Sequence, residues 1–294
     1  IINPNAGLPV QRDGKTCFDV GPEEYAELMY ELAGKGASIV GGCCGTTPEH
    51  IAQMIAKCKT LQPGGTRDCR LTAVSSYGKA VHLGEGPVII GERINPTGKK
   101  RLKEALVNGD LDYVCRLGLE VNVGTPGIDE AAMAAKAVPA LQAITDTPLQ
   151  IDTSNYEAME RALRLYNGKP MLNSVNGKED SLQHVLPLAK KYGAVLVALC
   201  LDDSGIPATA AGRIAAEYGI ESRNIVVDPL ALTISTGAEN AAIACEVIRT
   251  MKARAINTVM GVSNISFGLP GRDAVNSTFF SMAMAAGLSC GIIN

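Results

Sequence analysis

The stretch Leu149-Gln-Ile-Asp-Thr-Ser154 places a carboxylate directly after a short apolar run. Similar apolar runs recur along the chain and alternate with segments of helical periodicity. This alternation predicts parallel strands joined by helices, and eight strands fit a (β/α)8 TIM barrel of the α/β class. An open doubly wound sheet is the alternative, but no Gly-x-Gly-x-x-Gly motif follows the first predicted strand. The predicted strands are Val88–Ile90, Leu119–Val121, Leu149–Ile151, Pro170–Leu172, Ala194–Leu199, Asn224–Val227, Asn257–Val262 and Ser289–Ile293.

Seven carboxylates and amides follow six of these predicted strands, either directly or within a few residues. Barrel enzymes build their sites where strands run out into the following loops, so we expect these side chains to share one mouth. Together they can form several hydrogen bonds to a planar heterocycle that presents both N–H donors and ring acceptors. The alternative is that they only cap the helices that follow. The residues are Glu92, Asn95, Asn122, Asp152, Asn173, Asp228 and Asn264.

The first sixty residues predict a separate unit. Gly21–Gly34 has helical periodicity with acids in its first turn, Ala37–Val40 is typical of a buried strand, and Pro48 opens a second helix that runs to about Lys59. Turn-rich sequence follows, with no sustained apolar period before Gly86. We therefore expect a first domain over 1–61, a linker over 62–84 and the barrel over 85–294.

Composition excludes several classes of function. A net charge of −3 with 4% aromatic residues and no basic run argues against nucleic acid as a partner. The longest apolar runs are far shorter than the ~20 residues of a membrane span. Nine cysteines do not resemble the even framework of a small secreted domain, so we expect reduced thiols and a cytoplasmic protein. The apolar first and last residues predict a fragment of a longer polypeptide whose last barrel helix is missing.

Six motifs of the barrel region carry a resemblance to a known family. Taken in their order along the chain, these motifs strongly resemble the pterin-binding barrel of the cobalamin-dependent methionine synthase family, over about residues 85–294. Dihydropteroate synthases and corrinoid-protein methyltransferases resemble the same barrel. The motifs are Gly91-Glu-Arg-Ile-Asn-Pro-Thr-Gly98, Val121-Asn-Val-Gly124, Ile151-Asp-Thr-Ser154, Leu172-Asn-Ser174, Val227-Asp-Pro-Leu230 and Gly261-Val-Ser-Asn-Ile-Ser-Phe-Gly268.

The resemblance implies a substrate and a reaction. The substrate would be 5-methyltetrahydrofolate, whose methyl group passes from N5 to cob(I)alamin carried by a separate domain or partner, and finally to homocysteine in the intact protein. Asp152, Asn173 and Asp228 would contact the pterin ring and Asn264 would reach N5, so that Asn264, Asp152 and Asp228 carry the catalysis. Glu92 and Asn122 would border the pocket, and Arg272 would be a further ligand contact.

The stretch Val40-Gly-Gly-Cys-Cys-Gly45 resembles the zinc-binding strand end of the family's homocysteine-binding barrel. Residues 1 to about 60 resemble the final quarter of that domain. The resemblance implies that Cys43 and Cys44 are zinc thiolates, and such a site can bind a substrate thiol and lower its pKa. The family's third cysteine lies on an earlier strand, so we expect that ligand to be absent from this chain.

Three other functions remain open. One is a methyltetrahydrofolate:corrinoid-protein methyltransferase, and another is a folate-binding fragment without turnover. The third is dihydropteroate synthase, which needs a basic pocket for pyrophosphate, and the clustered candidates for it are Lys99, Lys100 and Arg101. No Ser/His/Asp constellation or phosphate-binding Gly-x-x-x-x-Gly-Lys motif supports hydrolysis or phosphoryl transfer.

Overall fold

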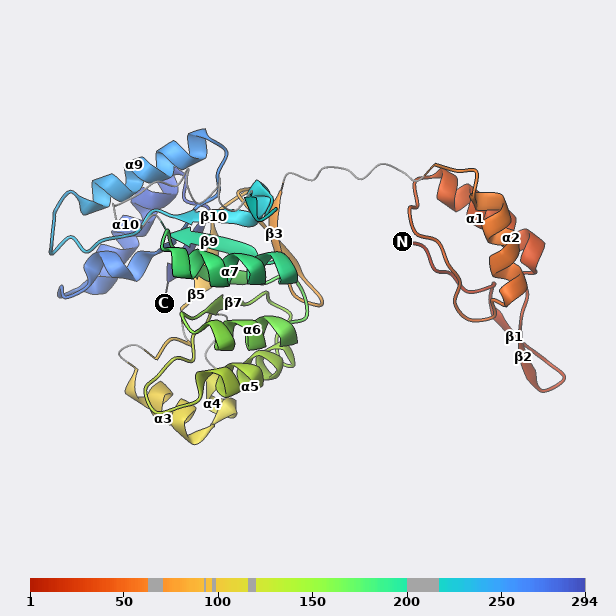
Figure 1. Cartoon of the computed structure of the whole chain (residues 1–294), viewed down its shortest axis with the longest axis horizontal. Coiled ribbons are helices and arrows are strands. Elements are labelled where there is room, and N and C mark those ends of the chain that lie inside the picture. The colour runs from red at the N-terminus through yellow and green to blue at the C-terminus, as the bar shows by residue number, and fades with distance from the viewer. Residues whose placement is uncertain (63–70, 93, 97–98, 116–119, 200–216, 294) are drawn as a thin grey trace. The chain divides into compact units, whose positions relative to one another are not determined.

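The computed structural model describes residues 1–62, 71–92, 94–96, 99–115, 120–199 and 217–293 (Figure 1). The chain divides into two compact units, Ile1–Cys69 and Arg70–Asn294. Each unit has its own buried apolar cluster.

The second unit contains a ring of eight parallel strands in the described part of the chain. One sheet has the order β6-β7-β8-β9-β10 and the other has the order β11-β12-β5. Parallel bridges between Ile94 and Val121 and between Val227 and Thr258 join the two sheets at both edges, which closes the barrel. All eight predicted strands are confirmed, although Leu119 lies outside the described residues. The strands are β5 (Val88–Gly91), β6 (Glu120–Val121), β7 (Gln150–Asp152), β8 (Met171–Val175), β9 (Val195–Leu199), β10 (Ile225–Asp228), β11 (Val259–Gly261) and β12 (Cys290–Ile293).

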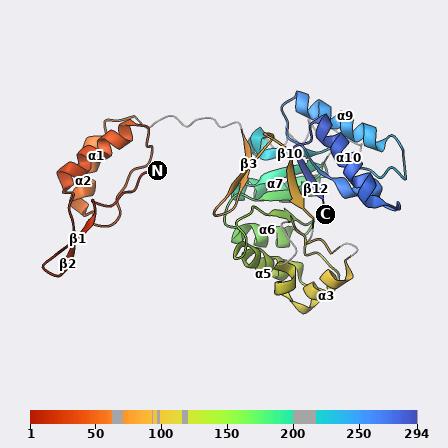
Figure 2. The same cartoon turned by 180° about the vertical axis from the view of Figure 1, so that it is seen from behind.

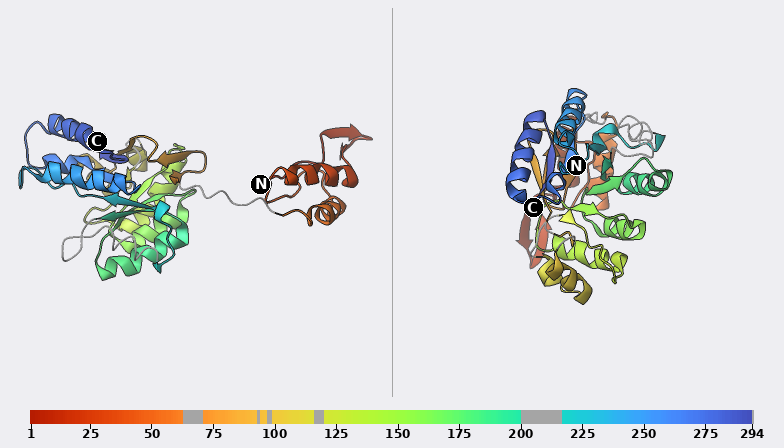
Figure 3. Two further views of the ribbon diagram at one scale, coloured as in Figure 1. Left: turned by 90° about the horizontal axis from the view of Figure 1, so that it is seen from above. Right: turned by 90° about the vertical axis from the view of Figure 1, so that its left-hand side faces the viewer.

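Helices surround the strands, as Figure 3 shows, and Figure 2 shows α9 beside α10. Helix α6 illustrates how the sequence produces this layer. Asn155 accepts hydrogen bonds from the backbone N–H groups of Glu157 and Ala158 at 3.1 and 3.0 Å, and the apolar side chains of the helix recur at helical spacing and are buried. The helices are α3 (Lys100–Asn108), α4 (Leu111–Cys115), α5 (Glu130–Gln142), α6 (Tyr156–Leu165), α7 (Glu179–Tyr192), α9 (Asn240–Ala253) and α10 (Arg272–Ala286), with 3-10 turns η1 (Ser222–Asn224) and η2 (Val262–Ser266).

A hairpin of β3 (Thr72–Ser75) and β4 (Ala80–Leu83) covers the amino-terminal end of the barrel. Ser75 pairs with Lys169 just before β8, and the Asn257 side chain just before β11 donates to Thr72 Oγ1 at 2.9 Å. Val74 and Leu83 are buried among residues of the barrel strands. The prediction of a linker over 62–84 therefore needs correction in its second half, which forms this hairpin. The hairpin has too few alternating apolar side chains to show a clear period in the sequence, but these side chains pack against the barrel strands and cover one end of the barrel.

The first unit contains a hairpin, two helices and two parallel segments. Its elements are β1 (Pro9–Arg12), β2 (Lys15–Phe18), α1 (Pro22–Gly34) and α2 (Pro48–Cys58). Both predicted helices are present. The strand predicted over Ala37–Val40 is reduced to one parallel bridge between Ile2 and Val40. Ala6, Tyr25, Met29 and Met54 form the buried core.

Among the described residues, no helix combines the length and apolar character that crossing a membrane requires. The cytoplasmic location stays a prediction.

Candidate functional site

Polar side chains occupy the carboxyl-terminal ends of the barrel strands. Asp152 is the last residue of β7 and pairs with Asn173 of β8, and Asp228 is the last residue of β10. Glu92 and Asn122 directly follow β5 and β6. Because parallel strands end at one rim, these five residues lie at the mouth opposite the β3–β4 hairpin. The sequence pattern predicted this placement.

Asn122 and Asp152 are joined directly across neighbouring strand ends. Asn122 Nδ2 donates to Asp152 Oδ2 at 3.2 Å, while Asn122 Oδ1 accepts from the backbone N–H of Gly124 at 3.1 Å. Both ends of the amide are therefore used, which fixes its orientation. Asp152 is only partly buried, so its carboxylate is held in place and remains accessible from the mouth.

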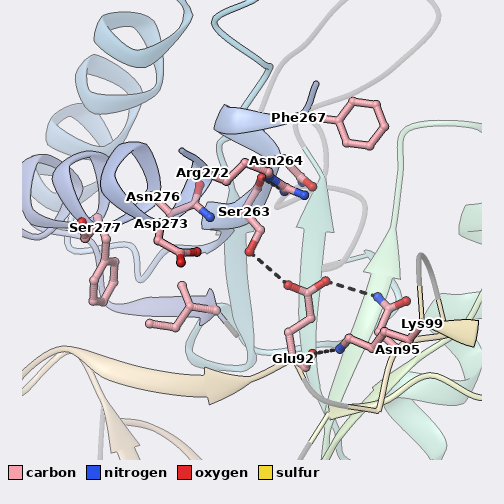
Figure 4. Close-up of a pocket in the computed structure, with 12 residues that line it drawn as sticks. Glu92, Asn95, Lys99, Ser263, Asn264, Phe267, Arg272, Asp273, Asn276 and Ser277 are labelled. Carbon is pink, nitrogen blue, oxygen red and sulfur yellow. Dashed lines mark hydrogen bonds between the residues drawn. The ribbon is translucent and has the colours of Figure 1, made fainter. Parts of the chain in front are cut away.

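Glu92 is held from two sides (Figure 4). Asn95 Nδ2 donates to Oε1 and Ser263 Oγ donates to Oε2, each at 3.3 Å, and Lys99 Nζ donates to the backbone carbonyl of Glu92 at 2.8 Å. Burial raises the pKa of Glu92 and the negative charge of Asp152 adds to the rise, while the Ser263 hydrogen bond and the nearby cations oppose it. The carboxyl group therefore holds a proton more readily than an exposed glutamate does.

Asn264 lies on the turn η2, and Arg272 braces that turn. Arg272 Nε donates to Ser266 Oγ at 3.0 Å, and Nη2 donates to the backbone carbonyl of Ser263 at 2.8 Å. The Asn264 side chain is exposed in the mouth. A Cβ atom at Gly261 would lie 3.0 Å from Asn264 Nδ2, so glycine leaves the room that this amide occupies. The structure thus gives Arg272 a positioning contact that the sequence did not predict.

Asp228 caps a tight turn after β10. Its Oδ1 accepts from the backbone N–H of Leu230 at 2.8 Å, and Leu230 adopts a φ of 59°. Burial raises the pKa of Asp228 to about 6, and the hydrogen bond from Leu230 lowers it in part. This carboxyl group changes charge only a little below neutral pH.

A cavity of about 560 Å³ lies beside this rim. It brings together Glu92, Asn95, Asn264 and Arg272 from the predicted residues, whereas Asn122, Asp152, Asn173 and Asp228 lie outside its lining. Several other lining residues were not predicted from the sequence. Ser263 and Phe267 lie inside the motif Gly261–Gly268, but Asn276 lies on α10, where no sequence signal marks it. The lining residues that were not predicted include Ser263, Phe267, Asp273 and Asn276, whereas Lys99 was predicted only as part of a pyrophosphate pocket.

Asn276, which lines this cavity, has an unsatisfied side-chain acceptor. Its Oδ1 is buried and has no hydrogen-bond partner among the described residues. A buried acceptor without a donor costs free energy, so Asn276 is a strained feature of the cavity wall.

The basic residues Lys99, Lys100 and Arg101 do not converge on one anion. Lys99 reaches the Glu92 carbonyl, Lys100 lies 3.9 Å from Glu104, and Arg101 stacks over Tyr113 with 4.7 Å from guanidinium carbon to ring centroid. Because these groups have three separate partners, the arrangement does not favour the pyrophosphate pocket of a dihydropteroate synthase.

In the first unit, Cys43 and Cys44 are both exposed, and their sulfur atoms lie 3.8 Å apart. Two thiolates at about 2.3 Å from one tetrahedral zinc ion are separated by about 3.8 Å, so the pair fits two positions of such a site. The neighbouring strand end helps to hold it, because Cys44 N donates to Asn5 Oδ1 at 3.1 Å. The hydrogen bond and charge of Cys43 raise the pKa of Cys44. The described residues contain no group of three or more metal-ligating side chains.

Two family models match this sequence. The pterin binding enzyme model matches residues 118–211 and 204–294, together more than half of the chain, and the homocysteine S-methyltransferase model matches residues 1–58.

Two curated relatives match the whole chain. The chain is 30% identical to methionine synthase of Mycobacterium leprae (strain TN) over an alignment 338 residues long, gaps included. It is also 30% identical to methionine synthase of Mycobacterium tuberculosis (strain ATCC 25618 / H37Rv) over an alignment of 329 residues. The alignments cover 100% of this chain and 28% of each relative, so the chain spans about 28% of their length.

Solved structures of dihydropteroate synthases share the barrel. The enzyme of Vibrio fischeri ES114 has a TM-score of 0.54 at 15% identity, and that of Xanthomonas albilineans in complex with 7,8-dihydropteroate has 0.52 at 17%. Each match covers 75% of this chain and 92% of the other. At this identity the likeness establishes the fold alone.

Proposed function

Because this chain belongs to the pterin-binding enzyme family, we propose that its barrel binds 5-methyltetrahydrofolate and passes the N5 methyl group to a cobalt(I) corrinoid acceptor. The observation that carries the proposal is the rim itself, where Asp152, Asn122 and Asp228 hold fixed positions beside the cavity that contains Asn264. The full-length methionine synthase relatives support this choice of substrate.

The carboxylates and amides of the strand ends would hold the pterin ring. Asp152 and Asp228 can accept hydrogen bonds from the amino-pyrimidine edge, which presents N–H donors, and Asn173 can both donate and accept. This set fixes the ring in its plane and therefore the direction of the N5–methyl bond. Methyl transfer needs the acceptor in line with the departing nitrogen, and positioning of this kind can supply several kcal/mol.

Asn264 would act at N5, because its amide is exposed on a braced turn within the cavity. A tertiary amine is a poor leaving group, so hydrogen bonding or proton transfer to N5 assists the reaction. The amide itself has no accessible pKa and can only hydrogen-bond. Glu92 lines the same cavity and has a raised pKa, so we assign it the role of proton source.

The first unit would contribute to a second half reaction with homocysteine. Cys43 and Cys44 would supply two thiolates to a zinc ion, which lowers the pKa of a bound substrate thiol. The corrinoid would arrive on another domain or protein and provides a cobalt(I) nucleophile for the methyl group. In that setting the chain would take part in methionine synthesis.

An equilibrium titration with 5-methyltetrahydrofolate tests the proposal. We expect the chain to bind it, Asp152→Ala to lose binding, and Asn264→Ala to bind while transferring the methyl group to added cob(I)alamin far more slowly. Each variant is checked by circular dichroism, so that loss of folding is recognised. No binding by the folded parent chain would exclude the proposed substrate.

The same titration separates the alternatives. A folate-binding module without turnover would bind the substrate and transfer nothing to cob(I)alamin. A methyltetrahydrofolate:corrinoid-protein methyltransferase would transfer the methyl group to a corrinoid protein without passing it on to homocysteine.

A further inference from the structure

Phe267 presents an aromatic ring in the mouth of the barrel. Its exposed fraction is 67%, and it lines the same cavity as Asn264. Figure 4 shows the ring standing beyond Asn264, on the side away from α10. Single exposed apolar side chains are common on protein surfaces, but this one belongs to a cavity that otherwise presents many polar groups.

The backbone that carries this ring is held firmly. Phe267 N donates to the Asn264 carbonyl at 3.1 Å, and the Phe267 carbonyl accepts from Thr233 Oγ1 at 3.0 Å and from Ser235 Oγ at 3.4 Å. Ile234 N also donates to the Ile265 carbonyl at 3.0 Å. The loop after β10 therefore fixes the backbone position from which the Phe267 ring extends.

We propose that Phe267 forms a subsite for the aromatic ring of the p-aminobenzoyl group of a folate, which deepens the proposed function and rests on it. In a folate this group is attached through a methylene to C6, the ring atom next to N5. With N5 beside Asn264, the substituent leaves the pterin on the Asn264 side of the mouth. Phe267 follows three residues later, so its face is available to the outgoing ring.

The chemistry of the two groups matches. The pterin needs polar partners, which the strand ends supply, whereas the benzoyl ring needs an apolar or aromatic surface outside the barrel. Offset or edge-to-face packing of two aromatic rings stabilises the contact beyond the effect of the area buried. The competing occupant is the corrinoid acceptor, which must also approach N5 through the mouth.

A comparison of two ligands tests the subsite. The whole chain and the variants Phe267→Ala and Phe267→Tyr are titrated with 5-methyltetrahydrofolate and with 5,6-dimethyltetrahydropterin, which lacks the benzoylglutamate group. We expect Phe267→Ala to bind the folate about 3- to 10-fold more weakly and the short pterin within about 2-fold of the parent. Phe267→Tyr keeps the ring and should retain both affinities.

Leu232→Ala is the matched control, because Leu232 is 60% exposed on the neighbouring loop and lies outside the cavity lining. It should leave both affinities unchanged. An equal loss of both ligands in Phe267→Ala would overturn the subsite, and so would unchanged affinities with a raised KM for cob(I)alamin, which would assign the ring to the acceptor. Failure of the parent chain to bind either ligand would instead remove the proposed function and the subsite with it.

Discussion

Ser263 Oγ donates to Glu92 Oε2 at 3.3 Å, and this hydrogen bond links the turn after β11 to the residue after β5. Strand β12 lies between β11 and β5 in the barrel, so the contact spans one strand of the rim. The same turn carries Asn264 and is braced by Arg272. Glu92 therefore contacts the same turn that carries the Asn264 amide.

Glu92→Gln should slow methyl transfer and change its dependence on pH. If Glu92 supplies a proton, the parent rate falls as pH rises through its raised pKa, and the variant lacks this limb. We expect a loss of about 10²-fold in the single-turnover rate, with the Kd for 5-methyltetrahydrofolate within about 3-fold. Single-turnover rates of methyl transfer to cob(I)alamin, measured over a range of pH for the parent and the variant, test both expectations. A variant with the parent rate and pH profile would show that Glu92 takes no part in the reaction. Glu246→Gln serves as control, because Glu246 is an exposed residue of α9.

Asp228→Asn should change how stability depends on pH. The folded pKa of Asp228 is about 6, whereas an unfolded aspartate has a pKa of about 3.9. Between these values the folded state binds more protons than the unfolded state, so the contribution of Asp228 to stability is greatest below about pH 4 and is lost as pH rises to about 6. The loss is on the order of 3 kcal/mol.

Urea unfolding at pH values from 4 to 7 measures this effect as the difference between the parent and Asp228→Asn. The amide can still accept from the Leu230 N–H but does not titrate, so the variant should gain stability relative to the parent as pH rises. Parallel curves over this range would contradict the raised pKa.

Arg272→Lys should impair the reaction more than binding. The guanidinium donates to two acceptors of one turn, and a lysine ammonium cannot reproduce this fork. We expect the methyl-transfer rate to fall about 10-fold or more, because a small displacement of Asn264 disturbs alignment, while the Kd changes by less than about 3-fold. Arg249→Lys is the control, since Arg249 is exposed and pairs with Glu246 at 3.2 Å. A Kd raised more than tenfold would make Arg272 a direct ligand contact.

The sequence predicted the barrel well because its strands are short apolar runs that alternate with amphipathic helices. The same pattern placed Asp152, Asn173 and Asp228 at one rim, since each directly follows a predicted strand, and in the structure they lie at or near the ends of β7, β8 and β10. Contacts between segments far apart in the sequence could not be predicted. Nothing near Ser263 in the sequence indicates Glu92 as its partner, and nothing in α10 indicates that Asn276 faces a cavity. The β3–β4 hairpin was also missed, because it has too few apolar side chains to give a clear period in the sequence.

The Cys43 and Cys44 thiols should bind a metal only as a pair. Their sulfur atoms are 3.8 Å apart, which suits one tetrahedral ion, and the glycines at 42 and 45 allow the tight backbone that brings them together. Titration with Co²⁺, which replaces Zn²⁺ in tetrahedral thiolate sites, should give a thiolate-to-cobalt absorption band. Homocysteine should strengthen the band by adding a third sulfur ligand. Cys43→Ser and Cys44→Ser should each abolish it, whereas Cys17→Ser, on β2, should leave it unchanged. A band that survives either single change would show that the adjacent thiols do not share one metal ion.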